Sequence, residues 1–254
     1  SLSLKGDVKA VLAKLAGMLP QQKHTAWMAQ VRGWKRRYPL RQTGAPGEVL
    51  PQDVLETLCR LTEGEAVLTT EVGQHQMWAA QYYTFRRPRQ FLTSGGLGTM
   101  GYGLGAAIGA QLARPGSRVV NIAGDGSFHM NCAELSTLAR CRLPVVELIF
   151  DNSVLGMVRQ WQKLFYGGRF SQTDLGGGTD YALLANAFGV KALKIETKDE
   201  IEPVLRQALA LREPVLIDCV ISRDQNVLPM VPAGGSVEDP MLTMPSNLSK
   251  EESH

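Results

Sequence analysis

Two short apolar runs, each followed by a polar residue, constrain the fold of this chain more than any other feature. Residues 118–123 (RVVNIA) and 145–150 (VVELIF) are continuous in apolar character and only six residues long. Such runs are typical of strands buried on both faces of a parallel sheet. Asp125 follows the first run and Asn152 follows the second. If the strands are neighbours, both side chains lie at the carboxyl edge of the sheet, where open α/β sheets bind ligands.

This pair of polar residues suits a small, hard cation. Mg²⁺ takes one or two protein carboxylate or carbonyl oxygens and shares the rest of its shell with water and phosphate oxygens. Gly124 and Gly126 flank Asp125 and permit close approach of an anion, towards which the backbone N–H of Ser127 could point. A purely structural alternative is that the Asp125 side chain only stabilises a turn by hydrogen bonding to the backbone. The Asn152 partner favours a Mg²⁺-bridged diphosphate site.

Strand-like and helix-like segments alternate along the chain. Apolar runs predict strands at 66–70, 91–93, 118–123, 145–150, 191–196 and 214–220, and helical patterns predict helices at 52–61, 98–113, 131–141, 154–165, 181–188 and 198–211. An apolar helical stripe with Asp7 as its N-cap precedes them. The alternation predicts an α/β fold: a parallel sheet with helices on both faces.

The composition excludes several classes of protein. The net charge of +3 is too small to argue for nucleic-acid binding, and the basic cluster 32–37 is best interpreted as a solvated helix face. No apolar run approaches the roughly 20 residues of a membrane span. The four cysteines lack CxxC spacing, which predicts core packing in a reducing compartment. The chain opens with a short apolar piece that leads directly into a helix, so we expect it to begin inside a fold.

A second motif offers a competing function. Gly96, Gly98 and Gly101 form the pattern G-x-G-x-x-G after a short strand, and Asp125 lies at the distance expected of a ribose-binding acid. A dinucleotide-binding domain is therefore the alternative to the metal site. That alternative gives Asn152 no role and does not need glycines on both sides of Asp125. The glycines could also serve close helix–sheet packing.

Several longer motifs carry a resemblance to a known family. They are GDGSFHMNCAELSTLARCRLPV with the later DN, TTEVGQHQMWAAQ (69–81), SGGLGTMGYGLGAAIGAQ (94–111), GMVRQWQKLFY (156–166) and VLPMVPAGG (227–235). The first resembles the thiamine diphosphate signature. Together they resemble the catalytic subunit of acetohydroxyacid synthase, also called acetolactate synthase, over about residues 6–235.

The resemblance implies a domain organisation and partners. Residues 1–45 are similar to the end of the family's central domain plus a linker, 46–221 to its thiamine diphosphate-binding domain, and 222–254 form an irregular tail. The pyrimidine domain, which carries the activating glutamate, has no counterpart here. No catalytic residue is therefore identifiable, and we expect the chain to be inactive alone. The resemblance also implies FAD in the intact enzyme, a homodimer or higher oligomer, and allows a regulatory small subunit.

The resemblance also implies roles for individual residues. Mg²⁺ would be bound by Asp125, Asn152 and the backbone carbonyl of Val154. Met100 would support the thiazolium ring, and Gly98 would contact the aminopyrimidine. The complete set implied for cofactor binding is Gln74, His75, Gly98, Met100, Gly124, Asp125, Gly126, Ser127, Asn152, Gly156, Met157 and Val158.

Two of these assignments leave a structural alternative open. Gln74 and His75 match positions that bind the diphosphate, but His75 could be a satisfied structural histidine. Met157, Val158 and Trp161 match the substrate and herbicide pocket, but Met157 and Trp161 are four residues apart and could be helix core.

The implied activity is decarboxylation of pyruvate and condensation with a second 2-keto acid, pyruvate or 2-ketobutyrate, in branched-chain amino-acid biosynthesis. The compartment would be the cytoplasm in a bacterium and a plastid or mitochondrion in a eukaryote. Another thiamine-dependent carboligase or oxidase, or a cofactor-binding module without chemistry, stays an alternative.

Overall fold

The computed structural model describes residues 2–245, and the chain divides into two compact units, residues 1–39 and 40–254. The first unit contains helices α1 (Val8–Met18) and α2 (Thr25–Arg37). Asp7 caps α1 as expected, because its Oδ1 accepts a hydrogen bond from the N–H of Ala10 at 2.9 Å. The basic cluster lies on α2 as expected, with three basic residues in its last turn.

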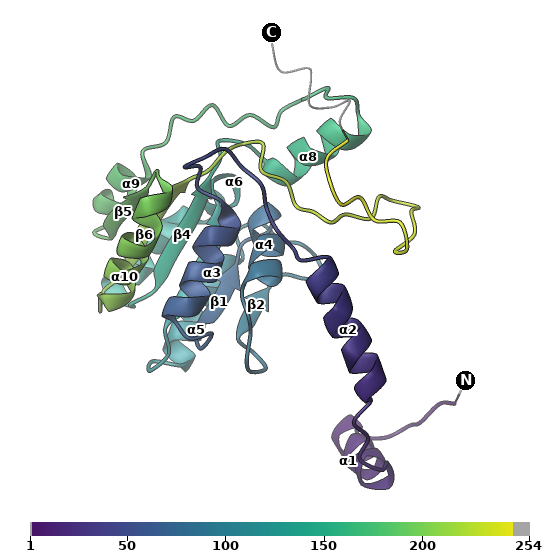
Figure 1. The fold of residues 1–254 in the computed structure, drawn as a ribbon. Helices are drawn as coiled ribbons and strands as arrows, with labels where there is room; N and C mark the ends of the chain where they lie inside the picture. Colours follow the sequence, from purple (N-terminus) through teal and green to yellow (C-terminus); the bar gives the residue numbers. More distant parts are fainter. Residues whose placement is uncertain (1, 246–254) are drawn as a thin grey trace. The chain divides into compact units, whose positions relative to one another are not determined.

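The second unit is built on one six-stranded sheet, in which every pairing is parallel (Figure 1). The strands are β1 (Val67–Thr70), β2 (Phe91–Thr93), β3 (Val119–Gly124), β4 (Val146–Asp151), β5 (Lys191–Ile195) and β6 (Val215–Val220). Their order across the sheet is β2-β1-β3-β4-β6-β5. All six lie where the apolar runs predicted strands, within a residue or so at each end.

Helices cover both faces of this sheet, which confirms the predicted fold class. One face is covered by α3 (Pro51–Leu61), α4 (Gln74–Tyr82) and α10 (Ile201–Ala210), which follows the 3₁₀ turn Lys198–Glu200. The other is covered by α5 (Gly103–Ala113), α7 (Leu135–Cys141) and α9 (Tyr181–Ala187). The short helix α6 (Asp125–Phe128), the 3₁₀ turn Cys132–Glu134 and α8 (Gly156–Phe165) complete the unit.

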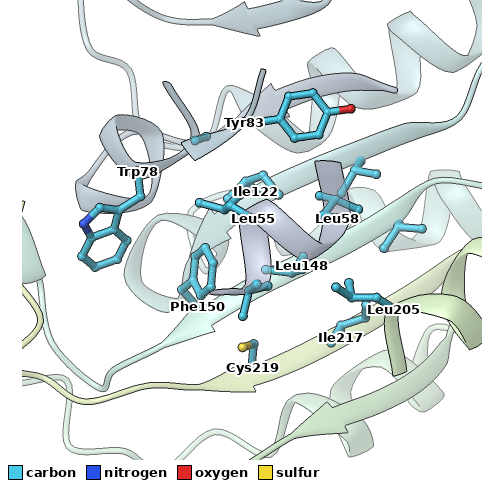
Figure 2. Close-up of a cluster of buried hydrophobic side chains, with 14 of the residues drawn as sticks. Leu55, Leu58, Trp78, Tyr83, Ile122, Leu148, Phe150, Leu205, Ile217 and Cys219 are labelled. Carbon is cyan, nitrogen blue, oxygen red and sulfur yellow. The ribbon is translucent and has the colours of Figure 1, made fainter. Parts of the chain in front are cut away.

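The core therefore consists of two apolar layers, one on each side of the sheet. In the first, Leu55 and Leu58 of α3 and Trp78 of α4 pack over Leu148 and Phe150 of β4 (Figure 2). Trp78 meets Phe150 edge to face, with ring centroids 6.0 Å apart. The second layer joins α5, α7 and α9 to the opposite face. Each large side chain that is fully buried contributes about 1.5–3 kcal/mol of transfer free energy.

The beginning of α5 differs from the sequence prediction. We expected a helix from residue 98, but α5 begins at Gly103. Gly98 and Gly101 have positive φ values of 71° and 87°, which a right-handed helix cannot contain. The stretch from 94 to 102 is therefore a turn-rich loop. Helices α4 and α6 were not predicted, although Trp78 and Tyr82 of α4 face the core four residues apart.

The cysteines and the tail complete the comparison with the sequence. Core packing is the role of Cys219, which is buried, but that expectation is wrong for Cys141, which is exposed. Residues 222–245 contain a single antiparallel bridge, between Met230 and Met241, and no named helix or strand. The rest of the expected tail, 246–254, lies outside the described residues. None of the helices within residues 2–245 is long and apolar enough to cross a membrane.

The strand order places a topological switch point beside β1. The chain leaves β1 for β2 on one side and returns as β3 on the other. In open α/β sheets the crevice beyond the carboxyl ends of such strands is the usual ligand site. The ends of β1, β3 and β4 are followed by α4, α6 and α8, so the loops that carry the predicted site residues converge there.

Candidate functional site

A cavity lies at the carboxyl ends of β1, β3 and β4. Its empty volume, including open solvent at the mouth, is about 500 Å³. Its lining comes from Val72, Gly73, Gln74, His75, Trp78, Met100, Gly124, Asp125, Gly126, Ser127, Phe150, Asn152, Val154, Leu155, Gly156, Met157 and Val158. The structure thus brings together all the predicted site residues except Gly98 and Trp161.

Sequence reasoning missed five residues that line the cavity: Val72, Gly73, Trp78, Phe150 and Leu155. Val72, Gly73 and Leu155 lie next to predicted site residues in the chain, so a wider window around each motif would have included them. Trp78 and Phe150 belong to the apolar core and form part of the cavity wall. Nothing in their sequence context separates that role from ordinary packing.

The end of the cavity near β3 and β4 holds the three predicted metal ligands, Asp125, Asn152 and Val154. Asp125 is only 3% exposed, and its Oδ1 accepts a hydrogen bond from the N–H of Gly126 at 2.9 Å. The Oδ1 of Asn152 accepts one from the N–H of Val154 at 3.1 Å. Both are local turn-type bonds, so the turn-forming role that we considered for Asp125 exists in the structure. Each oxygen keeps a second lone pair that a cation could use.

The electrostatics of this corner fit a cation. Burial, and after it the nearby Asp151 carboxylate, raise the pKa of Asp125 to about 8. A divalent cation would offset both effects by stabilising the charged carboxylate. Among residues 2–245 no cluster of three or more His, Cys, Asp or Glu side chains could hold a metal. Besides the Asp125 carboxylate, a cation here would depend on amide, carbonyl and ligand oxygens, which together are the donor set of Mg²⁺.

Two helices begin at this cavity and favour an anion. The N-cap of α4 is Gly73 and that of α8 is Leu155, and neither side chain caps its helix. The first N–H groups of a helix have no partner within it, and the helix dipole places partial positive charge at that end. Since Gly73, Gln74, Gly156 and Leu155 all line the cavity, it has the properties of a phosphate site.

The ring of His75 lies between the backbone at Gly73, before α4, and the backbone at Gly124, at the end of β3. A Cβ on either Gly73 or Gly124 would come within 2.7 Å of the imidazole ring. The two glycines are therefore needed for the ring to fit. Burial lowers the pKa of His75 to about 3, so the ring is neutral at pH 7. Its Nε2 atom is buried and has no hydrogen-bond partner, which makes it available to a ligand in the cavity.

The geometry argues against the dinucleotide alternative. In that fold the glycine-rich loop and the ribose-binding acid follow adjacent strands of one βαβ unit. Here the glycine-rich loop follows β2 and Asp125 follows β3, and β1 lies between the two strands. Met100 is the residue of this loop that lines the cavity, whereas its three motif glycines do not.

The remaining predicted residues lie on α8. Met157 and Val158 line the cavity, and Val158 is 50% exposed. Trp161 does not line it. Its ring lies edge to face with Phe165 at a centroid distance of 5.6 Å, and the side chain is 47% exposed. The alternative in which Met157 and Trp161 are helix core is wrong, since Gln160 is the buried residue of α8.

Comparison with known proteins agrees with this geometry. Residues 71–219 match the family model described as thiamine pyrophosphate enzyme, C-terminal TPP binding domain. "Acetolactate synthase 1, chloroplastic" of Oryza sativa subsp. japonica is 41% identical over 254 residues, covering 95% of this chain and 39% of the relative. "Acetolactate synthase catalytic subunit, mitochondrial" of Saccharomyces cerevisiae is 41% identical over 257 residues, covering 99% and 37%.

A third relative, "Acetolactate synthase isozyme 2 large subunit" of Escherichia coli, is 44% identical over 238 residues, covering 92% of this chain and 42% of the relative. The chain therefore spans about two fifths of the length of these relatives. The matched family residues begin just after β1 and include every residue that lines the cavity. The chain thus belongs to the thiamine pyrophosphate enzymes, in which it matches the C-terminal TPP-binding domain.

Proposed function

We propose that this chain is the Mg²⁺- and diphosphate-binding part of an acetolactate synthase. The enzyme would decarboxylate pyruvate and join the product to a second 2-keto acid, pyruvate or 2-ketobutyrate, in branched-chain amino-acid biosynthesis. The observation that carries the proposal is the cavity where Asp125, Asn152 and the beginnings of α4 and α8 meet. The sequence identity of 41% to two acetolactate synthases supports the reaction class.

The residues present fit thiamine diphosphate with Mg²⁺. Asp125, Asn152 and the carbonyl of Val154 would hold the cation, and the free N–H groups at the beginnings of α4 and α8 would hold the diphosphate. His75 would lie against the cofactor, and its unpartnered Nε2 could accept a hydrogen bond from a bound water. Gly124 and Gly126 keep the floor of the site open, since a Cβ at Gly126 would come within 2.6 Å of Leu155.

The apolar residues of the cavity would serve the chemistry. The thiamine ring supplies an electron sink for decarboxylation. Met100 would support that ring, and Met157 and Val158 would cover the reacting atoms and keep water away from them. Gly98 lies in the same loop as Met100 and would contact the aminopyrimidine. Trp161, which is half exposed on α8, would face the second 2-keto acid.

Further partners belong to the same proposal. A pyrimidine-binding domain would supply the activating glutamate, FAD would be a structural cofactor of the whole enzyme, and the active site would form in a homodimer or higher oligomer. A regulatory small subunit would bind the assembly. The site would operate in the bacterial cytoplasm, or in a plastid or mitochondrion. The relative from Oryza sativa is named as chloroplastic and the one from Saccharomyces cerevisiae as mitochondrial.

Calorimetric titration with thiamine diphosphate tests the proposal. We expect binding in the presence of Mg²⁺ and none after EDTA. Asp125→Ala should abolish the Mg²⁺-dependent binding, because the substitution removes the only carboxylate among the proposed ligands. Asp239→Ala, at an exposed position, is the matched control and should bind like the unaltered protein. Thiamine diphosphate binding that persists in EDTA, or an Asp125→Ala variant with unchanged affinity, would contradict the metal site. Binding of NAD instead of thiamine diphosphate would restore the dinucleotide alternative.

A further inference from the structure

A buried amide network connects the cofactor cavity to the segment after β6. Gln160 of α8 is 2% exposed, and its side chain pairs with both backbone groups of Val227. Its Nε2 donates to the Val227 carbonyl at 2.9 Å, and its Oε1 accepts from the Val227 N–H at 2.9 Å. Because a backbone N–H can only donate and a carbonyl can only accept, this pairing determines which way the Gln160 amide faces.

The same network determines the orientation of Gln74. Its Nε2 donates to Oε1 of Gln160 at 2.9 Å and to the carbonyl of Gln225 at 3.0 Å. Both partners are acceptors, so only the nitrogen of the Gln74 amide can face them. The two hydrogens of that nitrogen are then used. The oxygen of Gln74 must point in the opposite direction, away from Gln160.

That oxygen has no partner and lies beside Gly156, which also lines the cavity. Gln74 is 4% exposed and lines the cavity, and its Oε1 is buried with no hydrogen bond. A Cβ placed on Gly156 would overlap this oxygen and would lie 3.0 Å from Nδ2 of Asn152. The oxygen therefore lies beside the residue that we propose as a metal ligand, and the absence of a side chain at Gly156 makes room for it.

An orphaned acceptor of this kind selects its ligand by chemistry. A diphosphate oxygen is itself an acceptor, so it cannot pair with the Gln74 oxygen. Mg²⁺ keeps part of its water shell in protein sites, and water bound to a cation is a polarised donor. Leaving a buried acceptor unpaired is unfavourable, and a hydrogen bond from such a water would remove that penalty.

From these contacts we propose that the Gln74 side chain accepts a hydrogen bond from a water held by the divalent cation, and that Gln160 is the positioning residue that keeps the oxygen facing it. The inference rests on the proposed Mg²⁺–diphosphate site. It gives Gln74 a role distinct from diphosphate contact, which falls to the backbone N–H groups at the beginning of α4. It also makes the segment around Val227 part of the support of the metal site.

Two substitutions of Gln160 separate this role from simple anchoring of the Val227 segment. Gln160→Met removes both polar groups, so Gln74 loses the acceptor that orients it. Gln160→Glu keeps an oxygen that accepts from Gln74 and from the Val227 N–H. Burial favours the neutral acid, whose O–H can still donate to the Val227 carbonyl. The two variants therefore differ chiefly in whether Gln74 stays oriented.

The first measurement is the Mg²⁺ concentration at half-saturation, in the presence of thiamine diphosphate, for the 254-residue protein. We expect Gln160→Met to raise this midpoint about 10-fold, the scale of one hydrogen bond to a charged or polarised group, and Gln160→Glu to raise it less than about 3-fold. Gln74→Leu, which deletes the acceptor itself, should match Gln160→Met. The double variant Gln74→Leu with Gln160→Met should add no further shift, because both act on one interaction.

The second measurement needs no cofactor. Hydrogen exchange of the Gln74 side-chain NH₂, followed by ¹⁵N-edited NMR, should be slow in the unaltered protein and in Gln160→Glu and fast in Gln160→Met. Equal shifts of the Mg²⁺ midpoint in the two Gln160 variants would overturn the positioning role, and an unchanged midpoint in Gln74→Leu would overturn the water contact. If the unaltered protein binds no Mg²⁺ with thiamine diphosphate, the proposed function fails and the water contact fails with it. If cofactor binding is normal but the Gln74 NH₂ of the unaltered protein exchanges fast, only the orientation of Gln74 is contradicted.

Discussion

At the residue scale, the site depends on polar side chains that are buried without a charged partner. His75 shows the consequence most directly, because its ring is held between Gly73 and Gly124 and is 5% exposed. The folded protein therefore disfavours the imidazolium ion, which explains the lowered pKa of about 3. Because the ring is neutral, it can contact a ligand in the cavity without adding a buried charge that would itself need a partner.

The lowered pKa of His75 predicts an acid-sensitive fold. Between pH 6.5 and about 3 the unfolded chain binds a proton at this ring that the folded protein does not bind, so the free energy of unfolding falls as the pH falls through that window. The loss is at most about 1.4 kcal/mol per pH unit. His75→Phe keeps a ring and removes the titration, so its stability should decline less between pH 7 and pH 4.5. Urea unfolding measures this.

The control for that experiment is the exposed His24. His24→Phe should keep the pH dependence of the unaltered protein. An identical slope in His75→Phe and in the unaltered protein would show that the ring is not the source of the acid sensitivity.

At the scale of elements, α5 lies close to the sheet because it begins with glycine. A Cβ on Gly103 would come within 2.5 Å of Oδ1 of Asn121 and within 2.6 Å of the backbone N of Glu71. The side chain of Glu71, just after β1, makes a second contact with this region: its carboxylate accepts hydrogen bonds from the N–H groups of Gly101 and Leu104. The beginning of α5 and the loop that carries Met100 are therefore fastened to the end of β1.

This close contact predicts opposite effects for two glycines of one helix. Gly103→Ala should destabilise the protein by about 1–3 kcal/mol, because the backbone and Asn121 must move. Gly109→Ala has no atom within 4 Å of the new Cβ and should stabilise the protein by about 0.5–1 kcal/mol through helix propensity. Thermal or urea unfolding measures both. A neutral result at Gly103 would mean that α5 can shift on the sheet without cost.

A row of polar side chains crosses the middle of the sheet. Thr69, Asn121 and Glu147 occupy paired positions on β1, β3 and β4 and are fully buried. The hydroxyl of Thr69 donates to Asn121 at 2.8 Å, and the Asn121 amide donates to both carboxyl oxygens of Glu147 at 2.9 and 3.0 Å. Burial raises the pKa of Glu147 well above its usual range, and the Asn121 bond only partly opposes this.

The raised pKa of Glu147 predicts the opposite pH trend to that of His75. The folded protein retains a proton that the unfolded chain loses above about pH 4.5, so the free energy of unfolding falls as the pH rises towards the folded pKa. Glu147→Gln should flatten this decline between pH 5 and pH 8, which unfolding curves would show. Glu213→Gln, on the surface, should leave it unchanged. An equally steep decline in Glu147→Gln would contradict a protonated Glu147.

At the scale of the whole molecule, the two units differ in how much they bury. Helices α1 and α2 of residues 1–39 contain no buried residue, whereas four strands of the sheet are almost entirely buried along their length. Helices of 11 and 13 residues are only marginally stable without packing. Local stability should therefore differ sharply between the units.

Hydrogen exchange measures this difference. Amides of α1 and α2 should exchange in seconds to minutes, and those of β3 and β4 should exchange at least about 10³-fold more slowly relative to their intrinsic rates. Comparable protection in α2 and β3 would show that the first unit is stabilised by packing beyond its own helices.

Local sequence patterns were sufficient for the alternation of elements and for the polar residues at the strand ends. Six apolar runs became six parallel strands, and Asp125 and Asn152 met because β3 and β4 are neighbours. Gly98 shows the limit of such patterns, since G-x-G-x-x-G described a loop whose glycines do not line the cavity. Periodicity reports which side chains avoid water, and it says little about which loop faces a ligand.

What the sequence by itself determined is therefore the α/β class, the strand ends that carry the site and the donor chemistry suited to Mg²⁺. The tertiary structure alone decided the strand order that separates β2 from β3, the approach of the distant Gly124 to the His75 ring, and the direction of the Gln74 amide. These depend on contacts between distant parts of the chain, as in the bond from Gln74 to Gln225, which spans 151 positions. A hydrogen bond has a direction only when both partners are in place, and the fold brings them together.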